Sequence, residues 1–328
     1  MDRLRTLSAA SGLASMLLAL VGAAASAATL QVGAGKTYTT IAAAAAAANR
    51  GDTIEIFAGT YTSGAIFDDD DLTIRIAPGQ AKWSVKISGA INGKGIFIIK
   101  GDNVTVDGLR FDNAVVPDGN GAGIRQEGAN LTVRNSYFYG NEMGILATPL
   151  AGSEGPLTVI GSTFTNTRSR KSGSIGHGLY AIGRVTQLNV SGSTFLRGTK
   201  GHYIKSRALN SVITGNTIDD TNGSASYLID ISEGGAATIA NNVMVKGAKA
   251  QNCCNAIAYG PEMHKGGDFA NPPGPVLIEN NRFTNKRAST VNFVNNMSAP
   301  VNPVTLRGNV LIAEAGTIVP LKGAGTVE

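Results

Sequence analysis

The side chains best suited to chemistry lie in three short runs between Gly176 and Ser232. The runs read GHGLYAIGR (176–184), GHYIKSRA (201–208) and ASYLIDIS (225–232), and they hold two of the three histidines of the chain. Histidine, lysine, arginine, tyrosine and aspartate transfer protons or bind anions. The candidate site residues in these runs are His177, Tyr180, Arg184, His202, Tyr203, Lys205, Arg207 and Asp230.

One reaction that these residue types serve is β-elimination from a uronic acid. The C5 proton is abstracted, the C4 oxygen leaves, and the sugar carboxylate must be neutralised by a cation or a strong donor. A lysine near arginines can have its pKa lowered enough to act as the base. On this chemistry Lys205 is the predicted base, and Arg207 and Arg184 hold the carboxylate. Either His202 or Tyr180 donates a proton to the leaving oxygen.

A repeat along the chain predicts the scaffold that carries these residues. A turn residue recurs at spacings of 27, 26, 31, 23, 25, 40 and 28 residues. Apolar residues lie three positions after it, and also two positions before it except at Thr238. Short β-branched runs between Gly or Asn turns predict strands, and one apolar template per unit predicts a stacked solenoid. The turn residues are Gly108, Asn135, Gly161, Gly192, Gly215, Ala240, Asn280 and Gly308.

The residue after each turn residue is small and polar in most units. Stacked side chains at this position can pass hydrogen bonds along the axis of a solenoid and satisfy the turns. The residues expected in this column are Ser136, Ser162, Ser193, Asn216, Asn241, Asn281 and Asn309.

Counting back from the turn residue predicts which site residues share a face. Positions eight, ten and twelve before the turn alternate with small or apolar residues, so a period of two sends them outward together. The two histidines enter at the strand starts. The pairs expected at equal levels are Tyr180 with Tyr203, Lys205 with Asp230, and Arg184 with Arg207.

A purely structural role for these residues is the alternative. Lys205 and Asp230 can form a cross-strand ion pair on a solvated sheet, which contributes less than ~1 kcal/mol. Arg184 above Arg207 would then be an uncompensated repulsion, which favours a ligand site.

The beginning of the scaffold resembles a known architecture. The segment TLQVGAGKTYTTIAAAAAAANRGDTIEIFAGTY (29–61) combines strand-like runs at Thr29–Val32 and Thr53–Phe57 with an Ala-rich helix over Thr40–Asn49. It is similar to the first coil of right-handed parallel β-helix proteins of the pectate-lyase-like group, in which the helix caps the open end. The resemblance implies an all-β, right-handed parallel β-helix with a short N-terminal capping helix.

The run HYIKSRALNSVITGNTI resembles chondroitinase-B-like and alginate-lyase β-helix enzymes, in which the corresponding lysine is catalytic. The resemblance implies that Lys205 is the base. Those families have a catalytic arginine one coil later, where this chain has Tyr227–Ser232 and no arginine. Their calcium-binding acids before the lysine are replaced by Gly201, His202 and Tyr203.

A second comparison is with polygalacturonase-type hydrolases. The order of GHG (176–178) and YIK (203–205) is similar to their Gly-His-Gly and Arg-Ile-Lys segments. Inverting hydrolysis needs at least two carboxylates around the scissile bond. The segment NTRSRKSGSI before GHG contains no acid, and Asp230 alone is not a pair, so hydrolysis is disfavoured.

Composition limits the remaining possibilities. The chain has 328 residues, 42 of them glycine, and a formal net charge of +5. Arg3 and Arg5, an apolar run over 16–23 and the small residues 25–27 predict a secretory signal peptide at 1–27, with a membrane anchor as the alternative. We expect a single β-helix domain over 28–328 that is periplasmic or secreted, monomeric and without a membrane anchor after cleavage.

Two long units carry insertions that can wall a binding groove. They lie between Gly161 and Gly192 and between Ala240 and Asn280, and the second includes Tyr259 as a further substrate-binding candidate. It also holds adjacent cysteines, Cys253 and Cys254, which are either a vicinal disulfide or two free thiols. The run 68–71 of four aspartates lacks the spacing of a calcium loop, so neither a metal nor a cofactor is predicted.

The sequence thus predicts an exported protein that acts on an acidic polysaccharide, with no nucleic-acid partner. A polysaccharide lyase is the leading interpretation, and a C5-epimerase would share the proton abstraction. From another class, a non-catalytic polysaccharide-binding protein or periplasmic maturation factor remains open. A binder needs no second proton-transfer group near Lys205.

Overall fold

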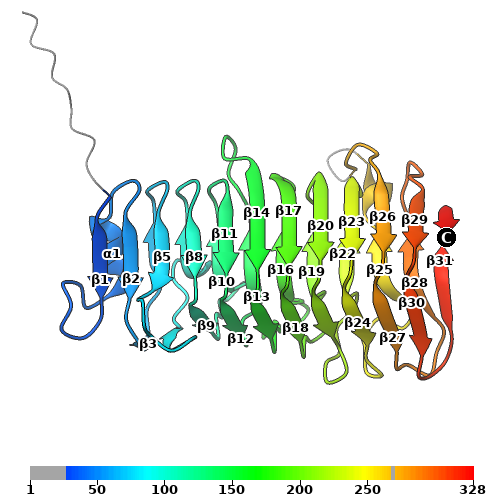
Figure 1. Cartoon of the computed structure of the whole chain (residues 1–328), viewed down its shortest axis with the longest axis horizontal. Coiled ribbons are helices and arrows are strands. Elements are labelled where there is room, and N and C mark those ends of the chain that lie inside the picture. The colour runs from blue at the N-terminus through cyan, green and yellow to red at the C-terminus, as the bar shows by residue number, and fades with distance from the viewer. Residues whose placement is uncertain (1–26, 267–269) are drawn as a thin grey trace, which may run out of the picture.

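The computed structural model describes residues 27–266 and 270–328, in which the strands form three parallel sheets along a rod (Figure 1). The predicted signal peptide lies outside the described residues apart from Ala27. In the part of the chain that the structure describes, no helix is long and apolar enough to cross a membrane.

Sheet 1 has 12 strands within the described residues. They are β1 (Thr29–Val32), β2 (Thr53–Ile56), β5 (Thr73–Ile76), β8 (Thr105–Asp107), β11 (Leu131–Arg134), β14 (Gly155–Ile160), β17 (Val185–Ser191), β20 (Asn210–Thr214), β23 (Ala236–Ala240), β26 (Val276–Glu279), β29 (Val304–Arg307) and β32 (Gly325–Val327).

Sheet 2 has 10 strands over the same described ranges. They are β3 (Gly59–Tyr61), β6 (Val85–Ile87), β9 (Arg110–Asp112), β12 (Tyr137–Tyr139), β15 (Thr163–Thr165), β18 (Thr194–Leu196), β21 (Thr217–Asp219), β24 (Val243–Lys246), β27 (Arg282–Asn285) and β30 (Val310–Ala313).

Sheet 3 also has 10 strands among the described residues. They are β4 (Ala65–Phe67), β7 (Gly95–Ile99), β10 (Ala122–Gln126), β13 (Met143–Ala147), β16 (His177–Ala181), β19 (Ile204–Ser206), β22 (Ile229–Ile231), β25 (Asn255–Tyr259), β28 (Val291–Asn296) and β31 (Ile318–Lys322).

Successive strands of each sheet belong to successive coils, so equivalent residues stack in columns. Phe111, Phe138, Phe164 and Phe195 are aligned by the pairing of β9, β12, β15 and β18. Their ring centroids are 5.1, 4.6 and 4.7 Å apart, and all four rings are buried in the core. The predicted parallel β-helix with an apolar interior is therefore confirmed.

The polar column at the turns is also present, with one correction. The column runs from Ser136 to Asn309. In each coil after that of Ser136, the side-chain oxygen of the column residue accepts the backbone N–H of the column residue one coil earlier. In the long unit the column residue is Asn242, not Asn241, and the left-handed turn residue is Asn241 (φ 57°), not Ala240. Because Asn241 and Asn242 are adjacent, the sequence pattern fits with either of them in the column. In the structure the apolar residue that enters the core after the turn is Met244, and Val243 is exposed, so the column residue is Asn242.

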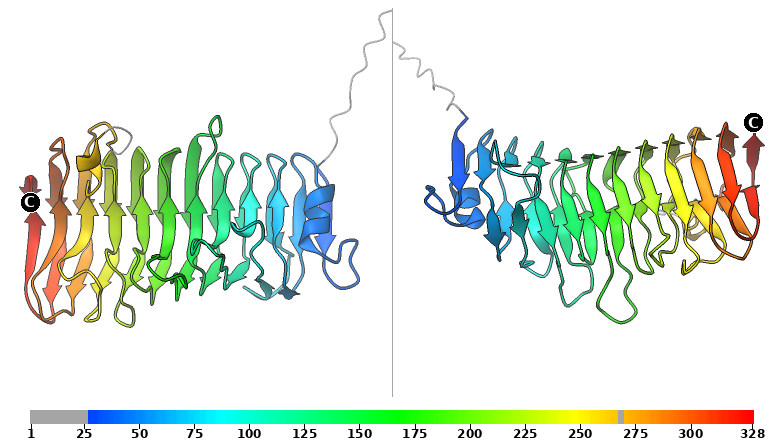
Figure 2. Two further views of the ribbon diagram at one scale, coloured as in Figure 1. Left: turned by 180° about the vertical axis from the view of Figure 1, so that it is seen from behind. Right: turned by 60° about the horizontal axis from the view of Figure 1, so that its bottom comes forward.

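The capping helix α1 (Ile41–Ala47) covers one end of the stack (Figure 2). Thr40 is its N-cap, and its Oγ1 accepts the N–H of Ala43 at 3.2 Å. Ile41, Ala44 and Ala45 are buried against the first coils. The helix thus covers the end of the core that the first coil leaves open. The one other helix of the described residues is a short 3₁₀ turn, η1 (Met263–Lys265).

The position of the polar column can be tested with two adjacent variants. Asn242→Ala leaves the buried N–H of Asn216 and the carbonyl of Ile213 without their partner, and we expect it to cost ~2–4 kcal/mol of unfolding free energy. Asn241→Gly keeps the left-handed turn, so we expect a change below ~1 kcal/mol. Urea denaturation measures both values. The reverse ranking would support the alignment expected from the sequence.

Candidate functional site

The candidate site lies on the outer face of sheet 3, over β16, β19 and β22. Strand pairing places Tyr180 beside Lys205, and Lys205 beside Asp230. The alternate residues Leu179, Ile204 and Ile229 fill the core on the other face. The sheet therefore brings three predicted site residues, Tyr180, Lys205 and Asp230, into one outward column.

Two cations and three carboxylates gather there, and we call them the charged cluster: Lys205, Arg207, Asp230, Glu233 and Glu262. The Nζ of Lys205 is 2.7 Å from Oε1 of Glu262 and 3.4 Å from Oδ2 of Asp230. The guanidinium of Arg207 pairs with Glu233 and, at 2.5 Å, with Oε2 of Glu262. Glu262 therefore bridges the two cations, with one oxygen on each.

Tyr180 joins this cluster through its hydroxyl. The Nε–H of Arg207 donates to the Tyr180 oxygen at 2.7 Å, and the Lys205 ammonium lies 5.4 Å from the centre of its ring. Burial raises the pKa of Tyr180, although both neighbouring cations act in the opposite direction. The hydroxyl is thus a neutral proton donor whose oxygen is already oriented.

The cluster is largely shielded from water, and this sets its protonation. Burial by itself lowers the pKa of Lys205, but the Asp230 charge and the hydrogen bond to Glu262 outweigh it, so the pKa of the amine is raised. Burial raises the pKa of Asp230, against the influence of Lys205. For Glu262 the two cations outweigh burial and lower its pKa. The amine of Lys205 is therefore protonated and held in ion pairs with Asp230 and Glu262.

The two predicted histidines form a stacked column with Tyr227. The ring centroids of His177 and His202 are 4.9 Å apart, and those of His202 and Tyr227 are 4.8 Å apart. The Nδ1 of His177 accepts the N–H of His202, and the Nδ1 of His202 accepts the N–H of Tyr227. Burial lowers the pKa of His177 to about 3 and lowers that of His202 well below its usual value.

Tyr203 and Tyr259 were expected at the surface, but both lie in the core. Tyr203 is aligned with Gly178 at the corner before the strand, where two successive residues face inward and the strict alternation breaks down. Its hydroxyl donates to Oδ1 of Asp220 at 2.8 Å. Tyr259 is aligned with the buried Ile231, and its hydroxyl donates to the carbonyl of Gly235 at 2.7 Å.

Arg184 was expected beside Arg207, but it lies apart from the charged cluster. Gln187 follows Ala181 by six positions, whereas its partner Asn210 follows Ser206 by four. These two extra residues shift the count from the turn, so Tyr180 is level with Lys205 and not with Tyr203. The expected Tyr180–Tyr203 and Arg184–Arg207 pairs do not form for this reason.

A groove of about 760 Å³ lies beside the cluster, and Arg184 is on its wall. Arg184 lines the groove with Leu150, Ile182 and Asn271. The side-chain amide of Asn271 donates to the carbonyl of Ala208 at 3.0 Å, directly after Arg207. The groove therefore opens next to the charged cluster, and Arg184 is 3.7 Å from Glu154 at its exposed edge.

The sequence-based prediction did not include Glu233 and Glu262. Glu233 follows β22 by two residues, and Glu262 lies just before η1 in the insertion after β25. That insertion was expected to wall a groove, which was the one available signal for Glu262. Its contact with Lys205 spans 57 positions of the sequence, so no local pattern could reveal it.

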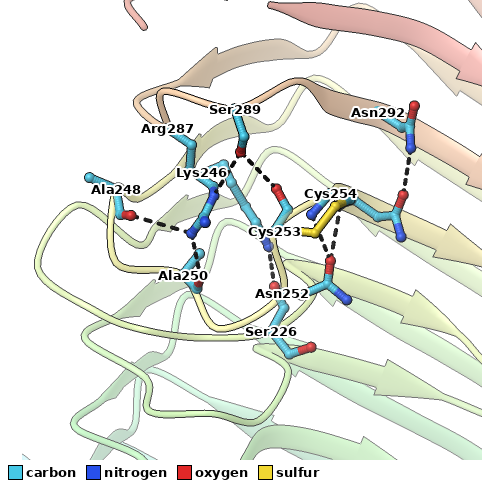
Figure 3. The surroundings of a disulfide bond; sticks show 11 residues. Ser226, Lys246, Ala248, Ala250, Asn252, Cys253, Cys254, Arg287, Ser289 and Asn292 are labelled. Atoms are coloured by element: carbon cyan, nitrogen blue, oxygen red, sulfur yellow. Dashed lines mark hydrogen bonds between the residues drawn. A yellow bond between two sulfur atoms is a disulfide. The ribbon is translucent and has the colours of Figure 1, made fainter. Parts of the chain in front are cut away.

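The same insertion settles the state of the two cysteines, because Cys253 and Cys254 form a disulfide. Asn252 accepts the N–H of Cys254 at 2.9 Å, and Ser289 donates to the carbonyl of Cys253 at 3.4 Å (Figure 3). Lys246 is fully buried beside this loop and donates to the carbonyl of Ser226 (Figure 3). Burial lowers the pKa of Lys246 to about 7.

The described ranges, 27–266 and 270–328, also bear on metal ligation. No group of three or more His, Cys, Asp and Glu residues in them has a geometry that could hold a metal ion. In the charged cluster, Lys205 and Arg207 occupy the carboxylate oxygens.

With this fold and site, the chain is a right-handed parallel β-helix protein. Residues 83–243 match the family model described as a right handed beta helix region. A search of curated proteins gives no match.

Solved structures extend the comparison to nearly the whole chain. An alginate lyase from Paenibacillus sp. str. FPU-7 has 17% sequence identity and a TM-score of 0.52, with 91% of this chain and 99% of that chain covered. The pectate lyase Pel9A has 16% identity and a TM-score of 0.52, with 90% and 79% covered. In fold, the chain therefore resembles polysaccharide lyases.

The buried histidines predict a loss of stability in acid. Because the folded pKa of His177 is about 3 and its usual value is 6.5, the unfolded chain binds the additional proton between these values. Stability therefore falls as the pH is lowered through this window, by up to ~1.4 kcal/mol per pH unit for this group. We expect His177→Gln to reduce the decrease in urea midpoint between neutral and mildly acidic pH.

The exposed His264 provides the matched control, since His264→Gln also removes one imidazole. We expect this variant to follow the wild type at every pH. If His177→Gln lost as much stability in acid as the wild type, the buried neutral imidazole would not be the cause.

Proposed function

We propose that this protein acts on an acidic polysaccharide and cleaves it by β-elimination at the outer face of sheet 3. The observation that carries the proposal is the bridging position of Glu262, whose two oxygens lie on Lys205 and Arg207 at 2.7 and 2.5 Å. Two cations arranged around one carboxylate are what a uronate ring requires for neutralisation of its acid group. In this reaction the substrate carboxylate takes the place of the Glu262 carboxylate.

Tyr180 is the group that we assign to proton transfer. Its oxygen is held by Arg207 at 2.7 Å, and it lies beside the cations that bind the uronate carboxylate. In the reaction the C5–H bond breaks, the C4–C5 double bond forms and the C4–O bond breaks. Tyr180 takes the C5 proton and then gives this proton to the leaving C4 oxygen.

The ion pairs of Lys205 oppose the role of base that the sequence predicted for it. Its ion pairs with Asp230 and Glu262 keep the amine protonated, since they raise its pKa. Lys205 can take the C5 proton only after it has lost its own. We therefore assign Lys205 and Arg207 to carboxylate neutralisation. Tyr180 must also lose its proton before it can act as the base, but its neighbours Lys205 and Arg207 favour this loss against the effect of burial. The tyrosinate form of Tyr180 is the base in this proposal.

The similar folds of an alginate lyase and a pectate lyase support the substrate class by analogy. Alginate and pectate are both polymers of uronic acids. The groove beside Arg207 and the exposed Arg184 on its wall offer room and charge for further sugar units. Export to the periplasm or the medium, where such polymers occur, belongs to the same proposal.

Hydrolysis is the second candidate, because the structure supplies carboxylates that the sequence pattern lacked. Asp230, Glu233 and Glu262 lie together around Arg207 and Lys205. Glycoside hydrolysis uses a protonated and an ionised carboxyl group. Burial raises the pKa of Asp230 and the cations lower that of Glu262, which separates the two protonation states.

The products distinguish the two reactions. A panel of polymers that includes polygalacturonate and alginate would be incubated with the full chain. Two signals would be measured over time: the ultraviolet absorbance of unsaturated uronates and the concentration of reducing ends. We expect both signals to rise together with at least one acidic polymer. Reducing ends without absorbance would indicate hydrolysis, and binding without either signal would indicate a non-catalytic protein.

Tyr180→Phe tests the assigned proton transfer. The variant keeps the ring, which packs 5.1 Å from His177, and removes the hydroxyl alone. We expect kcat to fall by ~10²–10⁴-fold with a small change in Tm. Tyr137→Phe on sheet 2 removes a hydroxyl far from the cluster and is the control. Lys205→Ala is a poorer test, because it removes the cation beside buried Asp230 and leaves that carboxylate next to the neutral His202 at 3.3 Å, and we expect it to cost ~3–5 kcal/mol.

Arg207→Lys tests the carboxylate site separately. A lysine cannot contact Tyr180, Glu233 and Glu262 from one planar group, so we expect kcat/KM to fall by ~10²–10³-fold. If Tyr180→Phe or Arg207→Lys turned over substrate at the wild-type rate, the charged cluster would not take part in the reaction.

A further inference from the structure

A second set of cationic side chains lies where the chain turns from sheet 2 to sheet 3. The turns after β9, β12, β15 and β18 enclose a cleft of about 240 Å³. We call it the basic cleft, and it is lined by Asn113, Tyr139, Asn166, Arg168, Arg197 and Thr199. These are the side chains of a polar cavity that carries positive charge.

The two arginines of the basic cleft are available to a ligand. Both are exposed, and within residues 27–266 and 270–328 no carboxylate pairs with either of them. Arg170 lies at the rim, where its guanidinium donates to Oδ1 of Asn113 at 3.1 Å. This contrasts with Arg207, whose guanidinium is held by two carboxylates and a tyrosine.

Acids on the neighbouring segments do not neutralise the cleft. Glu142 is fully buried, and its carboxylate accepts the backbone N–H groups of Val116, Gly121 and Arg170. These bonds join the segment after β9 to the loop after β15, which carries Arg168. Asp118 lies 3.9 Å from Lys171, which is a further cation of the same loop.

The backbone at Arg197 is a second and independent observation. Arg197 has a φ of 54°, in the left-handed region that favours glycine and asparagine. The equivalent turn residues of the three preceding coils are Asn113, Gly140 and Asn166. An arginine that adopts this conformation lowers stability relative to those residues. Such an outlier indicates a role for the side chain other than folding.

We propose that the basic cleft is a second binding site for the acidic polysaccharide. Arg168 and Arg197 pair with acid groups of the polymer, and the exposed ring of Tyr139 packs against a sugar ring. The narrow polar cavity, with one aromatic wall and amide groups of Asn113 and Asn166, fits a sugar with an acid group. The inference shares its polymer with the proposed function and is independent of the chemistry at the charged cluster.

The loop between the two sites connects them directly. A side chain at Gly176 would meet the backbone of Arg168 and Ser169 at 2.8 and 2.7 Å, so this loop lies against the residue before His177. A polymer held in the basic cleft is therefore next to the starts of β16 and β19. The cleft would retain a long chain near the charged cluster, whereas a short oligosaccharide would gain little from it.

The experiment compares two double variants of the full chain. Arg168→Asn/Arg197→Asn removes the cations of the cleft, and Arg282→Asn/Lys322→Asn removes the same charge from exposed positions in distant coils. Affinity for polygalacturonate and for alginate is measured by calorimetry at two salt concentrations. We expect the cleft variant to bind at least about tenfold more weakly, which is at least one unit in log Kd.

Stability and turnover separate this role from a structural one. Because asparagine suits the left-handed turn, we expect the Tm of the cleft variant to equal or exceed that of the wild type. If the polymer is cleaved, KM for long chains rises and kcat stays unchanged. Unchanged affinity, or an equal loss in the control variant, would overturn the second site.

Two further results keep the proposals apart. If the wild type binds the polymer more tightly than the cleft variant but forms no product, the proposed lyase activity is refuted and the second site is supported. Product formation with wild-type KM in the cleft variant would refute the cleft and support the activity. Equally tight, equally cleft-dependent binding of single-stranded DNA would show a general polyanion site and would also overturn the assignment to polysaccharide.

Discussion

Parallel stacking of the coils in register is the constraint on which the rest of this structure depends. Each strand bonds to the strands one coil before and after it, so every sequence position becomes a column with a spacing of ~4.8 Å. Inside, the columns must have matching shapes, as in the phenylalanine stack from Phe111 to Phe195. At the turns they must have matching hydrogen-bonding groups, as in Asn216, Asn242 and Asn281.

Outside, the same constraint brings charges close together and determines which ones can be neighbours. Lys205 is stable beside Asp230 because opposite signs follow each other along the column. Arg207 and Lys205 are both cations, and they share Glu262, which reaches them from a longer coil. A buried pair of this kind stabilises little once desolvation is counted. What the arrangement provides is a pair of cations already held around one carboxylate, that of Glu262.

The arginines of this protein therefore fall into two groups. Arg207 is surrounded by partners, and its position is determined by Tyr180, Glu233 and Glu262. Arg168 and Arg197 are exposed, and one of them adopts a backbone conformation that disfavours it. Charges of the first kind suit an orienting role at a reacting group, and charges of the second kind suit capture of a polymer from solution.

The sequence by itself determined the parallel β-helix and its capping helix, because short periodic patterns specify strands and turns. It also determined one pair of the outward column, Lys205 beside Asp230. It placed Tyr203 and Arg184 wrongly, since a count from one turn fails where two residues are inserted or where a corner turns two side chains inward. Tyr259, a substrate-binding candidate because of its place in an insertion, lies in the core. Only the tertiary structure decided the partners of Lys205 and Arg207. Glu262 is 57 and 55 positions away from them, and the insertion that carries it is positioned by packing between coils, which no local pattern encodes.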